Sequence, residues 1–211
     1  TAQQFEISPR RRGVRLLIAL FTALLLALPA AAQEGEDSLV VAINAIGNTL
    51  DPAVANFTNV TVAMSHVYDR IIAFDENFGF IPAVASDWEF VDGTTFRFTV
   101  GEGFVFHNGE PLTVDDVVYS IERLRDIPRL TSVMENVASV SATGEREVTI
   151  ELAEQNASTI RHLMAEAHVF NQAYAESAGA DPANEPIGTG PYRVARFVPG
   201  DRLELQAWEE Y

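Results

Sequence analysis

The sequence predicts a mixed α/β protein in which helices alternate with pairs of strands. An Asp92-Gly93 pair stands between two stretches of alternating apolar and polar residues, which is typical of a β-hairpin. A second pair of such stretches flanks Gly144 and Glu145. Between the two hairpins, residues 114–124 carry apolar side chains at the spacing of one helix face. These three observations together argue against an all-helical bundle and against a β-sandwich.

The first predicted element beyond the N-terminal region is a strand over Leu39–Ile43. Its sequence, LVVAI, is short, wholly apolar and rich in β-branched residues, which is typical of a strand buried on both faces. The next stretch, NAIGNTLDP (residues 44–52), contains a glycine, two asparagines and an Asp-Pro pair. These residue types predict a loop.

Residues 59–74 are predicted to form an amphipathic helix, followed by a turn over DENFGF (residues 75–80). The apolar side chains that recur at helical spacing are Val62, Val67, Tyr68 and Ile71. Beyond the turn, Trp88 and Phe90 precede the Asp92-Gly93 pair, and the alternation of Phe96, Phe98 and Val100 follows it. A strand is therefore expected on each side of this turn.

The second half of the chain is predicted to contain two further hairpins and one more helix. Strands over 133–140 and 147–152 form the first of these hairpins, and residues 157–166 form the helix. PANEP (residues 182–186) is a loop with two prolines. Alternating apolar residues around Pro199-Gly200-Asp201 then predict the last hairpin.

The N-terminus has the three parts of a secretory signal peptide. A basic segment, RRRGVR (residues 10–15), leads into thirteen apolar or near-apolar residues over 16–28, and Ala30 and Ala32 form an Ala-x-Ala cleavage site. A membrane anchor is the alternative, but it requires about 20 apolar residues. We therefore expect residues 1–32 to be removed after Ala32. Because no cysteine stands at the cleavage site to carry a lipid, we expect a soluble periplasmic protein rather than a lipoprotein.

The chain is strongly acidic, with 30 acidic residues against 14 basic ones. Removal of residues 1–32 takes away four Arg and one Glu, which changes the net charge from −16 to −19. Such a surface repels nucleic acid, so no nucleic-acid partner is expected. All basic residues are arginines, and there is no cysteine. Schiff-base chemistry, a phosphate-loop lysine, a thiol nucleophile and disulfides are therefore excluded, and no cofactor is predicted.

One stretch, FHNGEPLTVDDVVYSIERL (residues 106–124), suggests a site because a histidine and three carboxylates occur within ten residues. They are His107, Glu110, Asp115 and Asp116. One interpretation is a secreted hydrolase or metalloenzyme that uses His107 with these carboxylates. The other is a capped helix, in which Thr113 and Asp116 form a capping box before an apolar helix face. We favour the capped helix, because the capping rule uses these residues more completely.

Four motifs in order resemble the extracytoplasmic solute-binding proteins of family 5, the peptide, dipeptide and nickel receptors of ABC importers. The motifs are TLDPA (49–53), PAVASDWEFVDGTTFRFTV (82–100), residues 106–124, and GTGPYRVARFVPGDRLELQ (188–206). The resemblance implies a fold like that of type II periplasmic binding proteins, a mixed sheet with an inserted α+β domain. It assigns residues 39–60 and 175–211 to lobe I and residues 61–174 to the inserted domain. Family members continue into a further, C-terminal lobe that this chain lacks.

The resemblance implies a monomeric periplasmic receptor that binds a peptide or a similar small solute and delivers it to an inner-membrane ABC permease. Closure of the lobes around the ligand needs no covalent chemistry. A nickel or haem receptor remains an alternative within the family.

The best candidate for ligand contact is the loop after the first predicted strand. It follows the carboxyl end of a buried strand, where ligands bind in open α/β sheets, and the resemblance places it beside the cleft. The candidate residues are Asn44, Ala45, Ile46, Asn48, Thr49 and Leu50. Thr189 and Tyr192 are second candidates, for which simple strand packing is an equally good interpretation.

Overall fold

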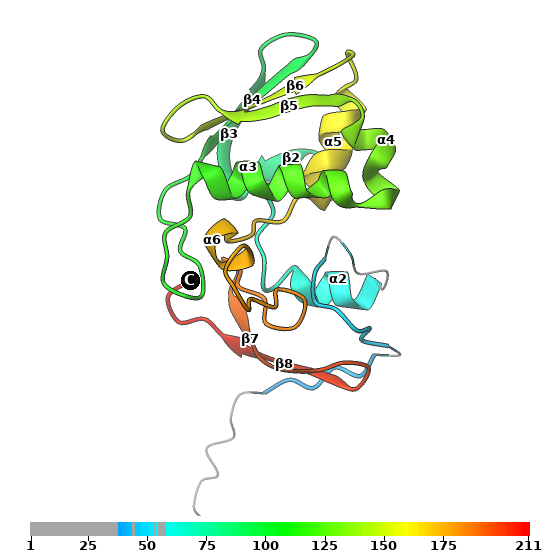
Figure 1. The fold of residues 1–211 in the computed structure, drawn as a ribbon, viewed down its shortest axis with the longest axis vertical. Coiled ribbons are helices and arrows are strands. Elements are labelled where there is room, and N and C mark those ends of the chain that lie inside the picture. The colour runs from blue at the N-terminus through cyan, green and yellow to red at the C-terminus, as the bar shows by residue number, and fades with distance from the viewer. Residues whose placement is uncertain (1–37, 44, 53, 55–57) are drawn as a thin grey trace, which may run out of the picture. The chain divides into compact units, whose positions relative to one another are not determined.

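The computed structural model describes residues 38–211, with the exception of residues 44, 53 and 55–57 (Figure 1). The predicted signal peptide, residues 1–32, and the candidate Asn44 lie outside the described residues. The chain divides into a unit of residues 1–42 and a larger unit of residues 43–211, which contains all the described helices and strands. No helix in the described part is both long and apolar enough to cross a membrane.

Helices and strands alternate along the chain, as predicted for a mixed α/β protein. In order, the elements are α2 (Thr58–Met64), β1 (Ile72–Phe74), β2 (Phe80–Pro82), β3 (Ala85–Phe90), β4 (Thr95–Val100), α3 (Val114–Glu122), η1 (Arg123–Asp126), η2 (Pro128–Leu130), α4 (Thr131–Met134), β5 (Val137–Ala142), β6 (Glu147–Leu152), α5 (Ala157–Glu166), α6 (Gln172–Ala175), β7 (Tyr192–Val198) and β8 (Arg202–Ala207).

Both hairpins predicted for the central part are present, and together they form one antiparallel sheet in the order β3-β4-β6-β5. The Asp92-Gly93 turn joins β3 to β4, and the Asp92 carboxylate accepts hydrogen bonds from the backbone N–H groups of Thr94 and Thr95. The predicted alternation is also present, because Phe96 and Phe98 are buried. Helices α3 and α5 lie against one side of this sheet (Figure 1).

Helix α3 begins with the predicted capping box. The Thr113 hydroxyl accepts from the Asp116 N–H, and the Asp116 carboxylate accepts from the Thr113 N–H at 2.9 Å. The apolar face of α3 then packs into the core between the sheet and the helices through Val117 and Ile121. We call this core, which extends from Ile71 to Val169, the first cluster.

A second, smaller apolar cluster lies apart from the first in the sequence. Its buried members are Ile46, Leu50, Val60, Met64, Val67, Tyr68 and Phe170. Half-buried side chains from the hairpin of β7 and β8 pack against it, namely Val194, Phe197, Leu203 and Leu205. The predicted hairpin around Pro199-Gly200-Asp201 thus covers the second cluster rather than joining the four-stranded sheet.

The chain passes between the two clusters twice, and the two passages are hydrogen-bonded to each other. The Ile71 N–H donates to the Ala167 carbonyl at 3.1 Å, and the Val169 N–H donates to the Asp69 carbonyl at 2.9 Å. Nearby, Arg123 forms an ion pair of 2.5 Å with Asp51. The first cluster is therefore an insertion whose entry and exit lie side by side.

The prediction of a buried strand over Leu39–Ile43 is wrong for this chain. These residues form no strand, and Leu39 and Val40 are 88% and 89% exposed. A strand buried on both faces belongs to a sheet whose two faces are covered by other elements. None of the three described sheets includes this run, so its apolar composition alone does not make it a strand.

The helix predicted over residues 59–74 is shorter than expected and ends at Met64. Val67 lies beyond it, and its carbonyl accepts the Gly190 N–H at 2.9 Å instead of continuing the helix. Residues 72–74 form strand β1, which pairs with β2. Likewise, residues 133 and 134 belong to α4, so the strand predicted from residue 133 begins at Val137.

Candidate ligand-binding pocket

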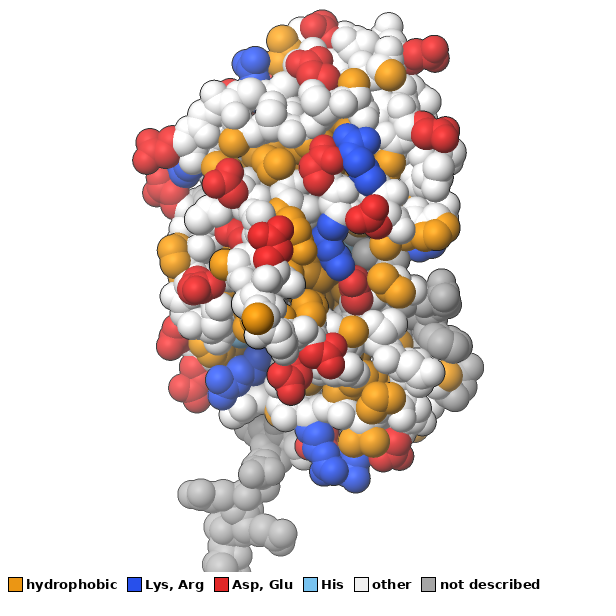
Figure 2. All heavy atoms as spheres, viewed as in Figure 1, with side chains coloured by type: hydrophobic (Ala, Val, Ile, Leu, Met, Phe, Trp, Pro, Cys, Tyr) orange, Lys and Arg blue, Asp and Glu red, His pale blue; other side chains and the backbone are white. Residues whose placement is uncertain are grey.

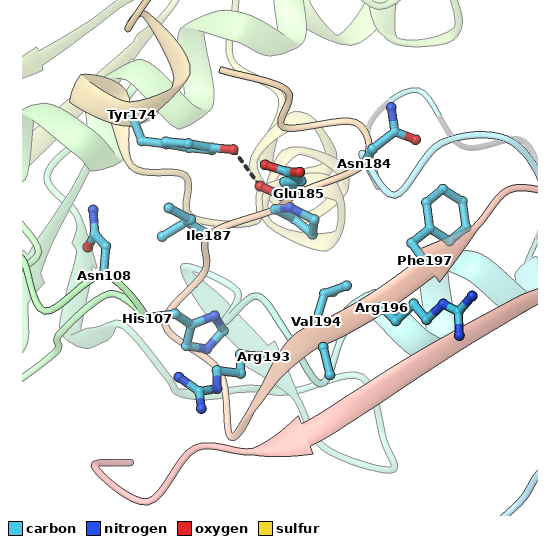
Figure 3. Close-up of a pocket in the computed structure, with 12 residues that line it drawn as sticks. His107, Asn108, Tyr174, Asn184, Glu185, Ile187, Arg193, Val194, Arg196 and Phe197 are labelled. Atoms are coloured by element: carbon cyan, nitrogen blue, oxygen red, sulfur yellow. Dashed lines mark hydrogen bonds between the residues drawn. The ribbon is translucent and has the colours of Figure 1, made fainter. Parts of the chain in front are cut away.

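A pocket of about 490 Å³ opens between three segments that are distant in the sequence (Figure 3). The first segment is the turn at the start of residues 106–124, the second extends from α6 into the loop before β7, and the third is β7 itself. The lining residues are His107, Asn108, Tyr174, Asn184, Glu185, Pro186, Ile187, Arg193, Val194, Ala195, Arg196 and Phe197. Its volume falls in the range of small-molecule sites, about 300–1,000 Å³.

His107 fixes one wall of the pocket through both of its ring nitrogens. Nδ1 accepts the Gly188 N–H at 3.4 Å, so Nε2 carries the proton and donates to the Gly190 carbonyl at 2.9 Å. Burial lowers the pKa of His107 below its ordinary value, and the nearby charge of Arg193 acts in the same direction. The ring is therefore neutral near pH 7 and holds the segment before β7 in place.

The two glycines of the GTGPY motif allow a very close backbone approach. A Cβ added at Gly188 would lie 2.0 Å from the Val67 carbonyl oxygen, and one at Gly190 would lie 2.7 Å from the His66 carbonyl oxygen. No side chain fits at either position without movement of the backbone. The motif therefore serves packing, as expected of glycines at the entry of a strand.

The opposite wall is held by Tyr174, whose hydroxyl donates to the Glu185 carbonyl at 2.6 Å (Figure 3). Tyr174 belongs to α6, which Asn171 caps through its side-chain oxygen. Pro186 is buried, and Ile187 packs against the first cluster. The walls are thus formed by hydrogen bonds within the protein itself, which makes the pocket preorganised.

The third wall is β7, from which five consecutive residues, Arg193 to Phe197, line the pocket. Arg193 donates two hydrogen bonds to Gln206 on β8, and its guanidinium lies 5.5 Å from the centre of the Trp208 ring. Arg196 is exposed and forms no ion pair with a described residue. Apolar area comes from the side chains of Val194 and Phe197.

The loop predicted to contact the ligand lies beside this pocket rather than in its lining. Ile46 and Leu50 are buried in the second cluster, and the Leu50 N–H donates to the Ala183 carbonyl at 2.6 Å. Thr49 is half-buried and its hydroxyl accepts from the Asp51 N–H. The remaining described candidates are Ala45, which is half-buried, and Asn48, which is exposed.

Thr189 and Tyr192, the second candidates, flank residues that line the pocket. Thr189 is buried and its hydroxyl donates to the Asp69 carboxylate at 3.0 Å. Tyr192 is 39% exposed and packs edge-on against His66. Neither lines the pocket, whereas Ile187 and Arg193 do. The signal that could have located the pocket is YRVARF, a strand with two arginines in a chain dominated by acids.

The structure gives His107, Glu110 and Asp116 other partners than those that the metal or hydrolytic interpretation requires. Both its ring nitrogens bond to backbone groups, and Asp116 serves the helix cap. The Glu110 carboxylate accepts hydrogen bonds from Asn171 and Asn108, which lower its pKa. Within the described residues, no group of three or more histidine or carboxylate side chains could hold a metal ion.

Comparison with known proteins assigns the chain to a family. The family model of bacterial extracellular solute-binding proteins, family 5 (middle), matches residues 79–211. The "Probable peptide-binding protein YejA" of Agrobacterium fabrum is 26% identical over 179 residues, which are 78% of this chain and 29% of that protein. This chain spans about a third of the length of the relatives that it matches.

Two solved structures share the fold. The ABC transporter-associated periplasmic binding protein DppA of Helicobacter pylori, in complex with the peptide STSA, has a TM-score of 0.71 at 21% identity, over 79% of this chain and 38% of that one. A nickel ABC transporter structure from Bacillus halodurans has a TM-score of 0.66 at 26% identity, over 78% of this chain and 34% of that one. The fold is therefore that of the N-terminal portion of these proteins. The chain belongs to the bacterial extracellular solute-binding proteins of family 5.

Proposed function

We propose that this protein is the periplasmic substrate-binding component of an ABC importer and that it binds a peptide or a similar small solute. The membership of family 5 supports the transport role. The name of the relative YejA, a probable peptide-binding protein, and the peptide in the DppA structure favour a peptide as the solute. The partner is then an inner-membrane permease complex, and the receptor acts as a monomer.

We also propose the domain organisation that the family resemblance implies. Residues 39–60 and 175–211 belong to lobe I, and residues 61–174 form the inserted domain. The separation of the two apolar clusters supports a division of this kind, although residues 61–68 and Phe170 pack with the cluster on the lobe I side. A further lobe then lies outside this sequence.

The export of the protein is a further part of the proposal. We propose that residues 1–32 direct the protein across the inner membrane and are removed after Ala32, which leaves no lipid anchor. Receptor function then consists of lobe closure over a bound solute, because the solute contacts both lobes only in the closed state and shifts the population toward it. No covalent step is required.

The single observation that carries the proposal within this chain is the preorganised pocket. Hydrogen bonds from His107 and Tyr174 fix two of its walls before any ligand arrives. The volume of the pocket falls in the range of small-molecule sites, and its lining combines fixed polar groups with the apolar side chains of Ile187, Val194 and Phe197. Groups held in place in this way lower the entropic cost of binding.

The test is calorimetric titration of the protein expressed from its complete reading frame. A panel of short peptides, sugars, nickel-histidine complexes and haem separates the alternatives within the family. We expect peptides to bind with micromolar or tighter affinity. Binding of the nickel complex or haem without peptides would make the protein a metal or haem receptor, and binding of nothing would overturn the transport proposal.

A pair of matched variants connects the solute to the pocket. Ile187→Glu places a charge in the pocket lining, whereas Ile81→Glu places one on the exposed strand β2. We expect the first variant to weaken binding at least tenfold and the second to leave it unchanged. Circular dichroism verifies that both variants fold.

A further inference from the structure

His168 lies in the second of the two passages between the apolar clusters. Its backbone forms an isolated antiparallel bridge with Arg70 of the first passage. The two backbone hydrogen bonds that join the passages lie on either side of this bridge. His168 is only 4% exposed, so its ring is shielded from water. A titratable group is therefore buried at the point where the two parts of the molecule are joined.

The His168 ring forms a hydrogen bond through only one of its two nitrogens. Nδ1 donates to the Glu166 carbonyl at 3.0 Å, so in the neutral ring Nε2 carries no proton. Nε2 is buried and has no hydrogen-bond partner among the described residues. The hydroxyl of Tyr68, whose ring packs edge-on against His168, has none either. A second proton on the ring would therefore create a buried donor without an acceptor in the described part of the chain.

The charges around His168 do little to compensate for a positive ring. They are Arg70 in the first passage, Glu166 at the end of α5 and Asp51 in the loop before α2. Both carboxylates already form ion pairs with arginines, and Arg70 itself opposes protonation. A buried charge is costly unless it is paired. Burial is accordingly the main cause that lowers the pKa of His168 to about 4.

The segment after His168 leads directly to one wall of the candidate pocket. The Phe170 N–H donates to the Ser120 hydroxyl at 2.8 Å, and the Gln172 N–H donates to a carboxylate of α3 at 2.8 Å. Helix α6 follows and carries Tyr174, whose hydroxyl fixes the wall. This helix contains no buried residue. It is therefore held by hydrogen bonds rather than by apolar packing, and segments of this kind open at a low cost in free energy.

We propose that His168 is a pH-sensitive switch between the two clusters: protonation of its ring opens residues 166–172 and releases α6, which loosens the Tyr174 wall of the pocket. In the closed state the neutral ring fits its site without a second hydrogen bond. In the open state water solvates the charged ring, so proton binding favours opening. The opening does not depend on any solute, whereas its effect on solute binding rests on the proposed transport function.

The direction and size of the effect follow from the two states of the ring. An exposed histidine binds a proton near pH 6.5, whereas burial lowers the pKa of His168 in the closed state to about 4. The closed state is therefore fully favoured above about pH 6.5 and loses this advantage as the pH falls to about 4. Between pH 7 and pH 4.5, the ratio of open to closed molecules should rise about 50-fold.

The test is backbone hydrogen exchange followed by NMR at pH 7 and pH 4.5, on the protein from the complete reading frame without solute. The reporters are the N–H groups of Val169, Phe170 and Gln172. We expect them to exchange faster than the amides of β4 and β6 and with little dependence on urea, because a local opening exposes little surface. The ratio of their exchange rates in wild type and His168→Phe should rise about 50-fold from pH 7 to pH 4.5.

The comparison of two proteins at the same pH removes the other contributions. Both share the intrinsic exchange rates, the titration of His107 and that of the acidic side chains spread over the face shown in Figure 2. His162→Gln, at an exposed position of α5, is the matched control and should behave like wild type. If His168→Phe does not fold, His168→Gln replaces it.

Each outcome bears on the switch separately from the transport function. A pH-dependent opening that persists in the His168 variant overturns the switch. Exchange of the reporter amides at the rate and with the urea dependence of β4 and β6 also overturns it, because the segment would then open only by global unfolding. Failure of every solute to bind in the calorimetric panel overturns the transport function and leaves the switch standing.

Discussion

The two apolar clusters are built in different ways. The first fills the space between a four-stranded sheet and several helices, and both central strands, β4 and β6, bury their apolar side chains almost completely. The second is covered by one short helix and the hairpin of β7 and β8, whose side chains remain half-buried or exposed. The first cluster therefore has the contacts of a complete domain core, whereas the second retains a strand edge that pairs with no other described strand.

The well-packed region and the region that holds the candidate pocket are therefore different parts of the molecule. A complete core makes the region around the first cluster rigid, and regions with less buried apolar area open more easily. Strand β7 lines the candidate pocket and belongs to the less covered region. The candidate pocket thus lies beside a strand that pairs with one described neighbour only.

The sharpest test of the difference is loss of one phenyl ring from each cluster. Phe98→Ala removes a side chain that is 1% exposed in the first cluster and should lower the free energy of unfolding by about 3–5 kcal/mol. Phe197→Ala removes a half-buried ring and should cost about 1–2 kcal/mol, because water already reaches part of it. Urea denaturation followed by circular dichroism measures both values.

Phe78→Ala serves as the control, since Phe78 is exposed in the turn before β2 and should change stability little. Equal losses for Phe98→Ala and Phe197→Ala would mean that the two clusters are equally complete. The second cluster would then be as well packed as the first.

The junction between the clusters should respond to pH through His168. Burial lowers the pKa of His168 to about 4, and its Nε2 has no hydrogen-bond partner in the described residues. In the unfolded chain the ring binds a proton near pH 6.5, so the unfolded state is favoured as the pH falls from about 6.5 to about 4. The charges around it are Arg70, Glu166 and Asp51, and the expected loss over this window is about 3 kcal/mol.

Urea midpoints of wild type and His168→Phe at pH 7 and pH 4.5 isolate this effect, because other groups titrate alike in both proteins. The difference between the two proteins should shift in favour of the variant at the lower pH. His162→Gln, at an exposed position of α5, is the matched control. A difference that does not change with pH would exclude His168 as the responsible group.

Substitution of Gly188 should destabilise the protein, although Gly188 lies in a loop, because its backbone approaches Val67 closely. Gly188→Ala places a Cβ against the Val67 carbonyl, so the backbone must move at a cost of about 1–3 kcal/mol. Gly93→Ala is the matched control, because its Cβ meets only the flexible end of the Gln155 side chain. Thermal unfolding should show a lower midpoint for the first variant alone. Similar midpoints for both variants would argue against a tight fit of the GTGPY motif.

The same contrast explains how far the sequence predicts the molecule. The hairpin at Asp92-Gly93, the cap at Thr113 and the helix over 157–166 depend on residues close in the sequence, and each is predicted correctly. The helix predicted over 59–74 ends at Met64, and the Val67 carbonyl beyond it bonds to Gly190, more than a hundred residues away.

The pocket escaped prediction for the same reason. His107, Tyr174 and Arg193 come together only through the folded arrangement of three segments. Local periodicity carries no information on such contacts. The sequence did contain one signal, the pair of arginines in β7. Only the structure shows that β7 pairs with β8 alone among the described strands and that both arginines line the pocket.

The smallest expected effect concerns the carboxylate that joins the two regions at α3. Asp116 closes the capping box, and its second oxygen accepts the Gln172 N–H at 2.8 Å, at the start of α6. Asp116→Ala removes both contacts and should cost about 1–2 kcal/mol. Asp115→Ala, next to it but exposed, should cost less than about 1 kcal/mol, since it loses only the favourable interaction with the helix dipole. Urea denaturation compares the two variants, and equal losses would show that Asp116 acts through its charge alone and does not hold α6 to α3.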